Sequence, residues 1–113
     1  MHEMALCESV LQIIEEHARR ERFHRVLEVR LEIGALAGVE IDAMRFGFDV
    51  VCRGTLADGA RLEIVEMPAR AHCFDCGETV PVAERYDPCP RCGGYRLQVT
   101  EGDQMRIKDL EVE

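Results

Sequence analysis

Apolar positions near the start of the chain recur at spacings of three and four, which is typical of an amphipathic helix. Over residues 3–20 the apolar side consists of Cys7, Val10, Leu11, Ile14 and Ala18. Residues 40–52 repeat this spacing, with an apolar stripe of Ile41, Met44, Phe48 and Val51. Glu40 and Asp42 favour the positive N-terminal end of this second helix, so the pattern predicts two helices.

Three other segments show a period of two instead, which indicates β-strands. Within residues 26–33 the apolar residues Leu27, Val29, Leu31 and Ile33 alternate with Glu28, Arg30 and Glu32. This alternation predicts a strand with one solvent-exposed face. A second strand is expected from Arg61 to Glu66, ending before Pro68. A third is expected from Gln104 to Val112, where a change of phase predicts a bulge near Asp109.

The composition limits the classes of partner. With 113 residues, 47% apolar side chains, no Trp and only 5% aromatics, the chain fits a small domain with an aliphatic core plus a smaller module. The net charge of −8, from 22 acidic and 14 basic residues, argues against binding to nucleic acid or to an anionic membrane. No stretch approaches the ~18 apolar residues of a membrane span. The first residues also lack a signal-peptide pattern, so we expect a cytoplasmic protein.

Four of the six cysteines form two pairs with metal-ligand spacing. Cys73 and Cys76 are followed by Gly77, twelve residues separate the pairs, and Cys89 and Cys92 are followed by Gly93. A two-residue gap lets both sulfurs of a pair reach one ion, and two facing turns supply the tetrahedron of thiolates that zinc prefers. Because four thiolates leave no open coordination position, we predict a structural rather than a catalytic zinc site.

Two other functions remain open for these cysteines. A rubredoxin-like iron site with four cysteine ligands would make the chain an electron-transfer protein, and a reactive dithiol would make it an oxidoreductase. A zinc ribbon that binds nucleic acid is disfavoured by the acidic balance. His72, beside the first pair, is a further candidate ligand. Cys7 and Cys52 lie on the apolar sides of the predicted helices, which indicates buried thiols.

Together these patterns predict an α+β protein. A small α/β domain, with two helices packed on a three-stranded sheet, is expected from residues 1–69 plus 99–113. Residues 70–98 are rich in cysteine, proline and glycine and contain few large apolar side chains, so they are expected to form an inserted zinc-ribbon-like module.

The N-terminus carries a second candidate metal site. A histidine at position two presents three nitrogens in sequence: the α-amine of Met1, the backbone amide of His2 and the His2 imidazole. Such nitrogen donors suit Ni(II) or Cu(II), which accept a near-planar geometry. The carboxylate of Glu3 is a further donor. A solvated, mobile terminus is the alternative interpretation of the same residues.

The chain resembles the HypA/HybF family of hydrogenase maturation proteins over essentially its whole length. The resemblance is carried by five segments: Met1-His2-Glu3 opening into a helix, Ile33-Gly34 through Gly38-Val39-Glu40, the helix around Arg45-Phe46-Gly47-Phe48, the two cysteine pairs, and the strand around Met105-Arg106-Ile107.

This resemblance implies a non-enzymatic nickel metallochaperone for maturation of [NiFe]-hydrogenase. By position, His2 would bind nickel with support from Met1 and Glu3, and Glu40 is a further candidate where some relatives have aspartate. The implied zinc ligands are Cys73, Cys76, Cys89 and Cys92. The implied partners are the GTPase HypB and the hydrogenase large-subunit precursor, with urease maturation factors for some members. The sequence leaves a monomer and a homodimer open.

Overall fold

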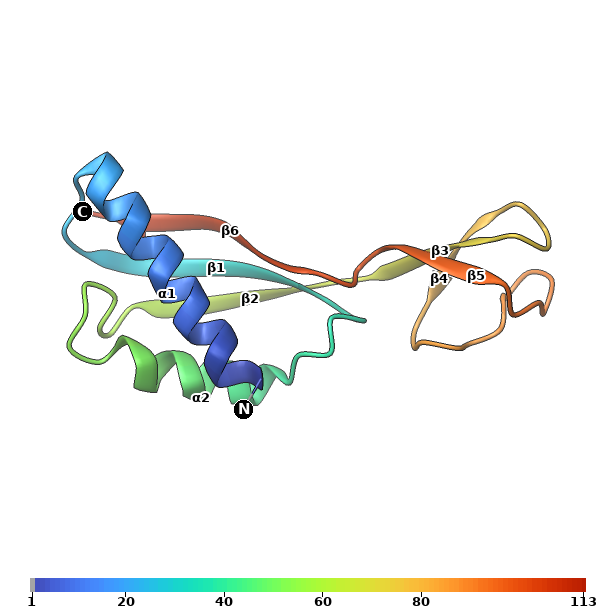
Figure 1. Cartoon of the computed structure of the whole chain (residues 1–113), viewed down its shortest axis with the longest axis horizontal. Coiled ribbons are helices and arrows are strands. Elements are labelled where there is room, and N and C mark those ends of the chain that lie inside the picture. The colour runs from blue at the N-terminus through green and yellow to red at the C-terminus, as the bar shows by residue number, and fades with distance from the viewer. Residues whose placement is uncertain (1) are drawn as a thin grey trace. The chain divides into compact units, whose positions relative to one another are not determined.

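The computed structural model describes residues 2–113, and the predicted amine donor Met1 lies outside them. The helices are α1 (His2–Glu21) and α2 (Ile41–Cys52). The strands are β1 (Val26–Gly34), β2 (Arg61–Met67), β3 (Ala69–Cys73), β4 (Thr79–Val82), β5 (Leu97–Glu101) and β6 (Met105–Val112) (Figure 1). They form one sheet of order β2-β1-β6 and another of order β4-β3-β5.

The chain divides into two compact units. The first contains the described residues through Leu31, then Val39–Ile64 and Ile107–Glu113; the second contains Glu32–Gly38 and Val65–Arg106. The division therefore falls within β1, β2 and β6. The predicted α+β class is confirmed: two helices accompany a three-stranded sheet, and the paired cysteines lie in a module of their own.

The core of the first unit is aliphatic, as the composition predicts. On α1 the buried residues are Cys7, Val10 and Ile14, and on α2 they include Met44, Phe48 and Cys52. Glu40 caps α2, because its side-chain Oε1 accepts a hydrogen bond of 3.3 Å from the backbone N–H of Asp42. Glu40 at the N-cap and Asp42 in the first turn thus lie at the N-terminal end of the second helix, where the sequence placed them.

Gly47 lies inside α2 because the two helices approach closely there. A Cβ at this position would lie 3.2 Å from the Cys7 Sγ and 3.5 Å from the Met4 Sδ, both on α1. The Cys7 thiol also donates a 3.4 Å hydrogen bond to the backbone carbonyl of Met44. Glycine, which weakens an isolated helix, therefore favours the close packing of the two helices here.

One face of β1 differs from the expectation. Val29, Leu31 and Ile33 are fully buried, as predicted, but Glu28 is also buried instead of solvent-exposed. Its carboxylate forms ion pairs with Arg30 at 2.7 Å and with Arg61 at 3.0 Å, and Arg30 contacts Asp109 at 2.5 Å. Arg30 on the same strand and Arg61 on the neighbouring strand β2 compensate the charge of Glu28, which strand periodicity alone does not reveal.

The second unit contains a sheet that the sequence did not predict. After Pro68 the chain continues as β3, which pairs antiparallel with β4 and with β5. The pairs Ala71↔Val80, Ala71↔Val99 and Cys73↔Leu97 place these residues on one face. Ala71 is buried there, and Cys73, Val80 and Cys89 form a buried cluster with Val82 and Leu97 packed against it.

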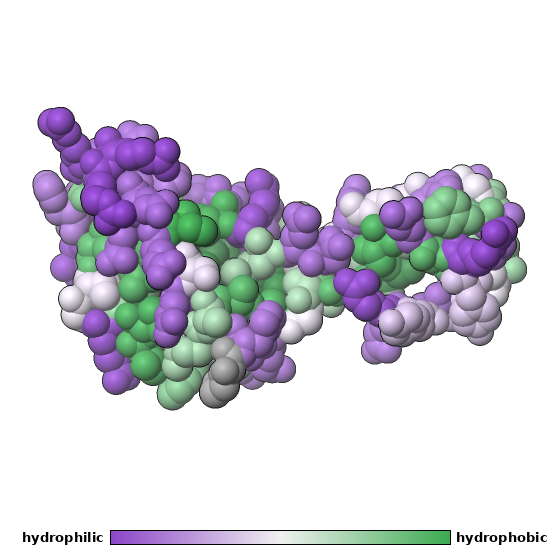
Figure 2. Space-filling view, in the orientation of Figure 1, coloured by the Kyte–Doolittle hydropathy of each residue, from purple (hydrophilic) through white to green (hydrophobic). Residues whose placement is uncertain are grey.

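The last strand shows the predicted change of phase. Met105 and Ile107 are half-buried at alternate positions, and the next half-buried residue is Leu110. The bulge near Asp109 that would accompany this change stays a prediction. Hydrophilic and hydrophobic areas are interspersed on the surface (Figure 2). Neither helix among residues 2–113 is long and apolar enough to cross a membrane.

Candidate metal centres

The four paired cysteines converge on one point. The sulfurs of Cys73, Cys76, Cys89 and Cys92 all lie within 4.8 Å of one another, with 3.6 Å between Cys73 and Cys92 and 3.8 Å between Cys76 and Cys89. In a tetrahedral zinc site with bonds of about 2.3 Å the sulfurs are about 3.8 Å apart, so this set fits the ion. In residues 2–113 no other group of three or more His, Cys, Asp or Glu side chains is arranged to hold a metal.

The two cysteine turns have the same backbone hydrogen bonds. Gly77 donates to the carbonyl of Cys73 and Gly93 to that of Cys89, both at 2.8 Å. Both glycines have φ of 75°, a left-handed conformation that side chains rarely adopt. This conformation lets main-chain amides approach the sulfurs. In the second turn the Arg91 N–H contacts the Cys89 Sγ and the Gly94 N–H contacts the Cys92 Sγ, each at 3.4 Å.

The pKa values of the Cys89 and Cys92 thiols are shifted in opposite directions, although the amide contacts lower both. Burial raises the pKa of Cys89, but the backbone amides of Cys92 and Arg91 stabilise the thiolate, and the pKa falls to about 7. At Cys92 the Gly94 amide lowers the pKa, yet burial and the neighbouring sulfurs of Cys73 and Cys89 raise it to about 12. Four sulfurs at this spacing resist simultaneous ionisation, so a bound cation is needed to balance their charge.

An ion pair that the sequence did not predict joins the first cysteine turn to the residue before β5. Asp75, between the first two cysteines, accepts a 2.7 Å hydrogen bond from the Arg96 guanidinium. A Cβ at Gly94 would lie 2.2 Å from the Asp75 Oδ2, so a larger residue there would displace the Asp75 side chain from this ion pair. No spacing rule identifies this pair. The only available signal was the polar residue inside the first cysteine pair.

The N-terminal candidates lie at the junction of the two helices. The Nδ1 of His2 is 3.4 Å from the Oε2 of Glu3. The same Oε2 accepts a 3.3 Å hydrogen bond from the backbone N–H of Glu40. The structure therefore brings His2 and Glu3 together and links them to Glu40 through its main chain, while the Glu40 carboxylate caps α2.

The environment of Glu3 favours its ionised form. Its pKa is lowered, first by the Glu40 amide, then by its own backbone amide and by the His2 side chain. The His2 side chain is 58% exposed and that of Glu3 17%. A carboxylate beside an exposed imidazole gives an open pair of donors for a divalent cation.

The remaining candidate ligands lie elsewhere. Cys7 and Cys52 are buried, as predicted, and burial raises the pKa of both thiols, that of Cys52 to about 11. Such thiols are poor nucleophiles. The His72 ring packs edge-on against Phe74, with 5.0 Å between the ring centroids, and is not part of the sulfur cluster.

The amino-acid sequence is similar to known proteins over essentially its whole length. A family model described as "Hydrogenase/urease nickel incorporation, metallochaperone, hypA" matches residues 1–112. A protein of Alkalilimnicola ehrlichii named Hydrogenase maturation factor HypA is 68% identical, and one of the same name from Azotobacter chroococcum is 58% identical; each comparison covers 100% of both chains.

A solved structure has the same fold. The solution structure of the Ni metallochaperone HypA from Helicobacter pylori has a TM-score of 0.73 and 27% sequence identity, covering 97% of this chain and 96% of that one. The fold, the converging cysteines and these matches agree with the resemblance inferred from the sequence. The chain therefore belongs to the HypA family of hydrogenase and urease nickel-incorporation metallochaperones.

Proposed function

We propose that this protein is a non-enzymatic nickel carrier of the cytoplasm, which takes up Ni(II) at its N-terminus for maturation of [NiFe]-hydrogenase. His2 is the principal donor, the α-amine of Met1 and the carboxylate of Glu3 support it, and Glu40 is a further candidate donor. The observation that carries the proposal is the arrangement of the Glu3 Oε2, which lies 3.4 Å from the His2 Nδ1 and 3.3 Å from the Glu40 N.

This geometry suits a single cation. Two donor atoms 3.4 Å apart can both reach one ion at the ~2.1 Å typical of imidazole and carboxylate bonds to a first-row metal. The lowered pKa of Glu3 keeps its carboxylate charged. The bond from Glu40 fixes that carboxylate to the start of α2 and so limits the motion of the first turn of α1.

Exposure of the site supports transfer rather than storage. A carrier must release its cargo, and the His2 side chain is 58% exposed, so incoming ligands can reach the ion. The paired cysteines form the opposite kind of site, since four thiolates close the coordination sphere. We infer that they hold a structural zinc ion within residues 70–98 and that nickel belongs to residues 1–69 plus 99–113.

The proposed partners follow from the family. The client is the [NiFe]-hydrogenase large-subunit precursor, the GTPase HypB cooperates in loading it, and urease maturation factors are further clients in members that serve urease. The net charge of −8 agrees with a carrier that binds neither nucleic acid nor membranes.

The test is nickel titration by calorimetry of the zinc-loaded protein with a native, unextended N-terminus. We expect His2→Ala to weaken nickel binding at least about tenfold, as loss of a metal ligand does. His17→Ala is the matched control, because His17 is an exposed histidine on the same helix. A short extension before Met1 should also weaken binding. Equal affinity in all four proteins would overturn the proposal.

Zinc content, measured on the same samples, checks the second site. We expect one zinc ion per chain in every variant, in a colourless protein. Iron with visible absorbance would instead support the electron-transfer alternative.

A further inference from the structure

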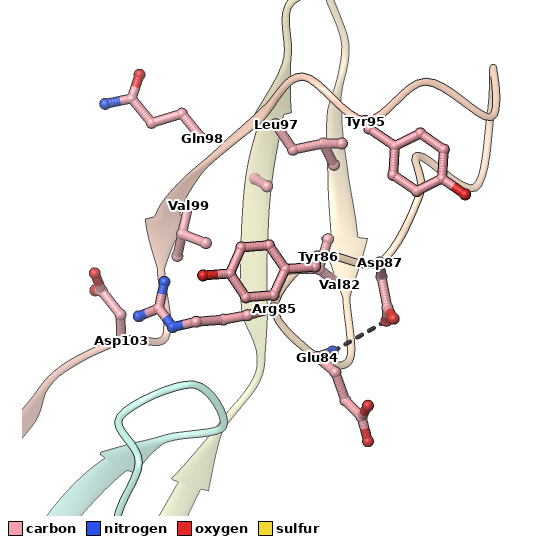
Figure 3. Close-up of a pocket in the computed structure, with 11 residues that line it drawn as sticks. Val82, Glu84, Arg85, Tyr86, Asp87, Tyr95, Leu97, Gln98, Val99 and Asp103 are labelled. Carbon is pink, nitrogen blue, oxygen red and sulfur yellow. Dashed lines mark hydrogen bonds between the residues drawn. The ribbon is translucent and has the colours of Figure 1, made fainter.

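An open groove of about 380 Å³ lies within the second unit, and none of the predicted metal ligands is among the residues that line it. Its floor is the apolar face of the β4-β3-β5 sheet, and residues 84–87 arch beside it (Figure 3). The floor consists of Ala71, Val82, Leu97 and Val99. These side chains share one face because Ala71 is paired with Val99, and Val82 and Leu97 pack on the same cluster of Cys73, Val80 and Cys89.

Two largely exposed tyrosines line the groove. The Tyr86 ring extends across the groove toward Val99, and Tyr95 lies near Leu97 (Figure 3). Tyr86 is 93% exposed and Tyr95 is 74% exposed. Tyr86 also has φ of 70°, a left-handed conformation that is unfavourable for a bulky residue. A ring this exposed is not part of the hydrophobic core, and backbone strain of this kind is concentrated at functional positions.

The rim of the groove is acidic. Glu84, Asp87 and Asp103 supply three carboxylates, against one guanidinium from Arg85. The Arg85 Nη2 already donates a hydrogen bond of 3.3 Å to the carbonyl of Leu36. A ligand that enters between the tyrosines therefore meets an apolar floor and negative charge at the rim.

We propose that this groove binds an extended segment of a partner protein that carries an aromatic or aliphatic side chain between Lys or Arg residues. The apolar side chain lies on the floor between Tyr86 and Tyr95, and its basic neighbours face Glu84 and Asp103. Ligand-binding pockets usually have volumes of roughly 300–1,000 Å³. The volume of this groove is near the lower end of that range, so the groove can hold one or two side chains. Tyrosines with an acidic rim form the kind of anchor that binds such a segment. The proposal is independent of nickel binding at His2.

Three acetylated peptides test the proposal: Lys-Leu-Phe-Leu-Lys, Glu-Leu-Phe-Leu-Glu and Lys-Ser-Ser-Ser-Lys. Each is titrated into the isotope-labelled, metal-loaded full chain while amide chemical shifts are recorded. We expect only the first peptide to shift the amides of residues 82–87 and 95–99. Equal binding of all three, or shifts confined to other residues, would overturn the proposal. Self-association of the chain through these residues would also overturn it, because the occupant would be a second copy.

Variants separate a binding role from a structural one. Tyr86→Gly removes the exposed ring and suits the left-handed backbone, so we expect at least about fivefold weaker peptide binding with no loss of thermal stability. The pair Glu84→Lys and Asp103→Lys should weaken binding further and invert the preference toward the glutamate peptide. The pair Glu8→Lys and Glu16→Lys, an exposed change of the same charge on α1, is the control and should bind as the wild type does. Unchanged affinity in Tyr86→Gly would contradict the proposal.

Discussion

The carboxylate of Glu3, in the first turn of α1, accepts a hydrogen bond of 3.3 Å from the main-chain N–H of Glu40, the residue that caps α2. The two residues are 37 positions apart in the chain. Since one partner contributes a side chain and the other its backbone, substitutions can separate the charge of each residue from the hydrogen bond that joins them.

At Glu3, the comparison of Gln with Ala separates charge from positioning. Glu3→Gln keeps an oxygen that accepts from the Glu40 N–H but loses the negative charge, so nickel affinity should fall about two- to fivefold, as for an exposed charge pair. Glu3→Ala loses the hydrogen bond as well and should weaken binding more. Calorimetric titration measures both. If Glu3→Gln binds nickel as tightly as the wild type, the carboxylate is not a donor.

At Glu40, Ser and Ala both remove the carboxylate, but only Ser keeps an oxygen that caps α2. Glu40→Ala should lower the free energy of unfolding by about 1 kcal/mol, and Glu40→Ser by less than half of that. Denaturant unfolding measures this difference. Nickel affinity should fall to the same extent in both variants, because both lose the same charge. Unchanged affinity in Glu40→Ser would remove Glu40 from the donor set.

The pH dependence of nickel binding identifies the donors that titrate. The pKa of Glu3 is lowered by the Glu40 amide, so its carboxylate stays ionised above the ordinary glutamate range, about 4.3. The stability that this hydrogen bond contributes is present above the ordinary glutamate range and is lost only as the pH falls through the lowered pKa of Glu3.

Nickel affinity should nevertheless fall between about pH 7.5 and 5, because imidazole and amine donors must lose protons to bind the metal. Titrations of the wild type and Glu3→Gln should show the same pH slope; a flat profile would exclude nitrogen donors.

Metal removal should affect the second unit selectively. Its buried cluster is only Cys73, Val80 and Cys89, with Val82 and Leu97 packed against it, so much of its stability depends on the ion that joins the two cysteine turns. We expect a chelator, or Cys73→Ser, to abolish amide protection in β3, β4 and β5 while α1 stays protected in hydrogen exchange. Cys52→Ala is the control, because Cys52 is a buried cysteine outside the cluster and its loss should leave zinc content unchanged. Retained protection after zinc removal would show that the module folds without metal.

The close approach at Gly47 predicts a coupling between the helices. In the wild type, Gly47→Ala gains helix propensity but places a methyl group 3.2 Å from the Cys7 Sγ. Cys7→Ala removes that sulfur, so Gly47→Ala should be more favourable in the Cys7→Ala background by about 1 kcal/mol. Unfolding free energies of the four proteins measure this coupling. Additive effects would mean that the helices move apart at little cost.

The sequence by itself determined the local features. Both helices, the strand starting at Val26 and the apolar sides of the helices followed from spacing, because periodicity records which face is buried. The cysteine cluster followed from two short gaps and two glycines, since each pair of ligands is joined by one tight turn. The chemistry of the terminus followed from three adjacent nitrogens, and its role in nickel binding stays a prediction.

Only the tertiary structure decided which distant residues meet. The burial of Glu28 depends on Arg61 from another strand, and the packing advantage of glycine at position 47 depends on Cys7 from another helix. The hydrogen bond from Glu40 to Glu3 likewise joins segments that are far apart in the sequence, and so does the groove beside Tyr86. A chain records its own periodicity in the order of its residues, whereas contacts between separate segments depend on how their surfaces pack after folding.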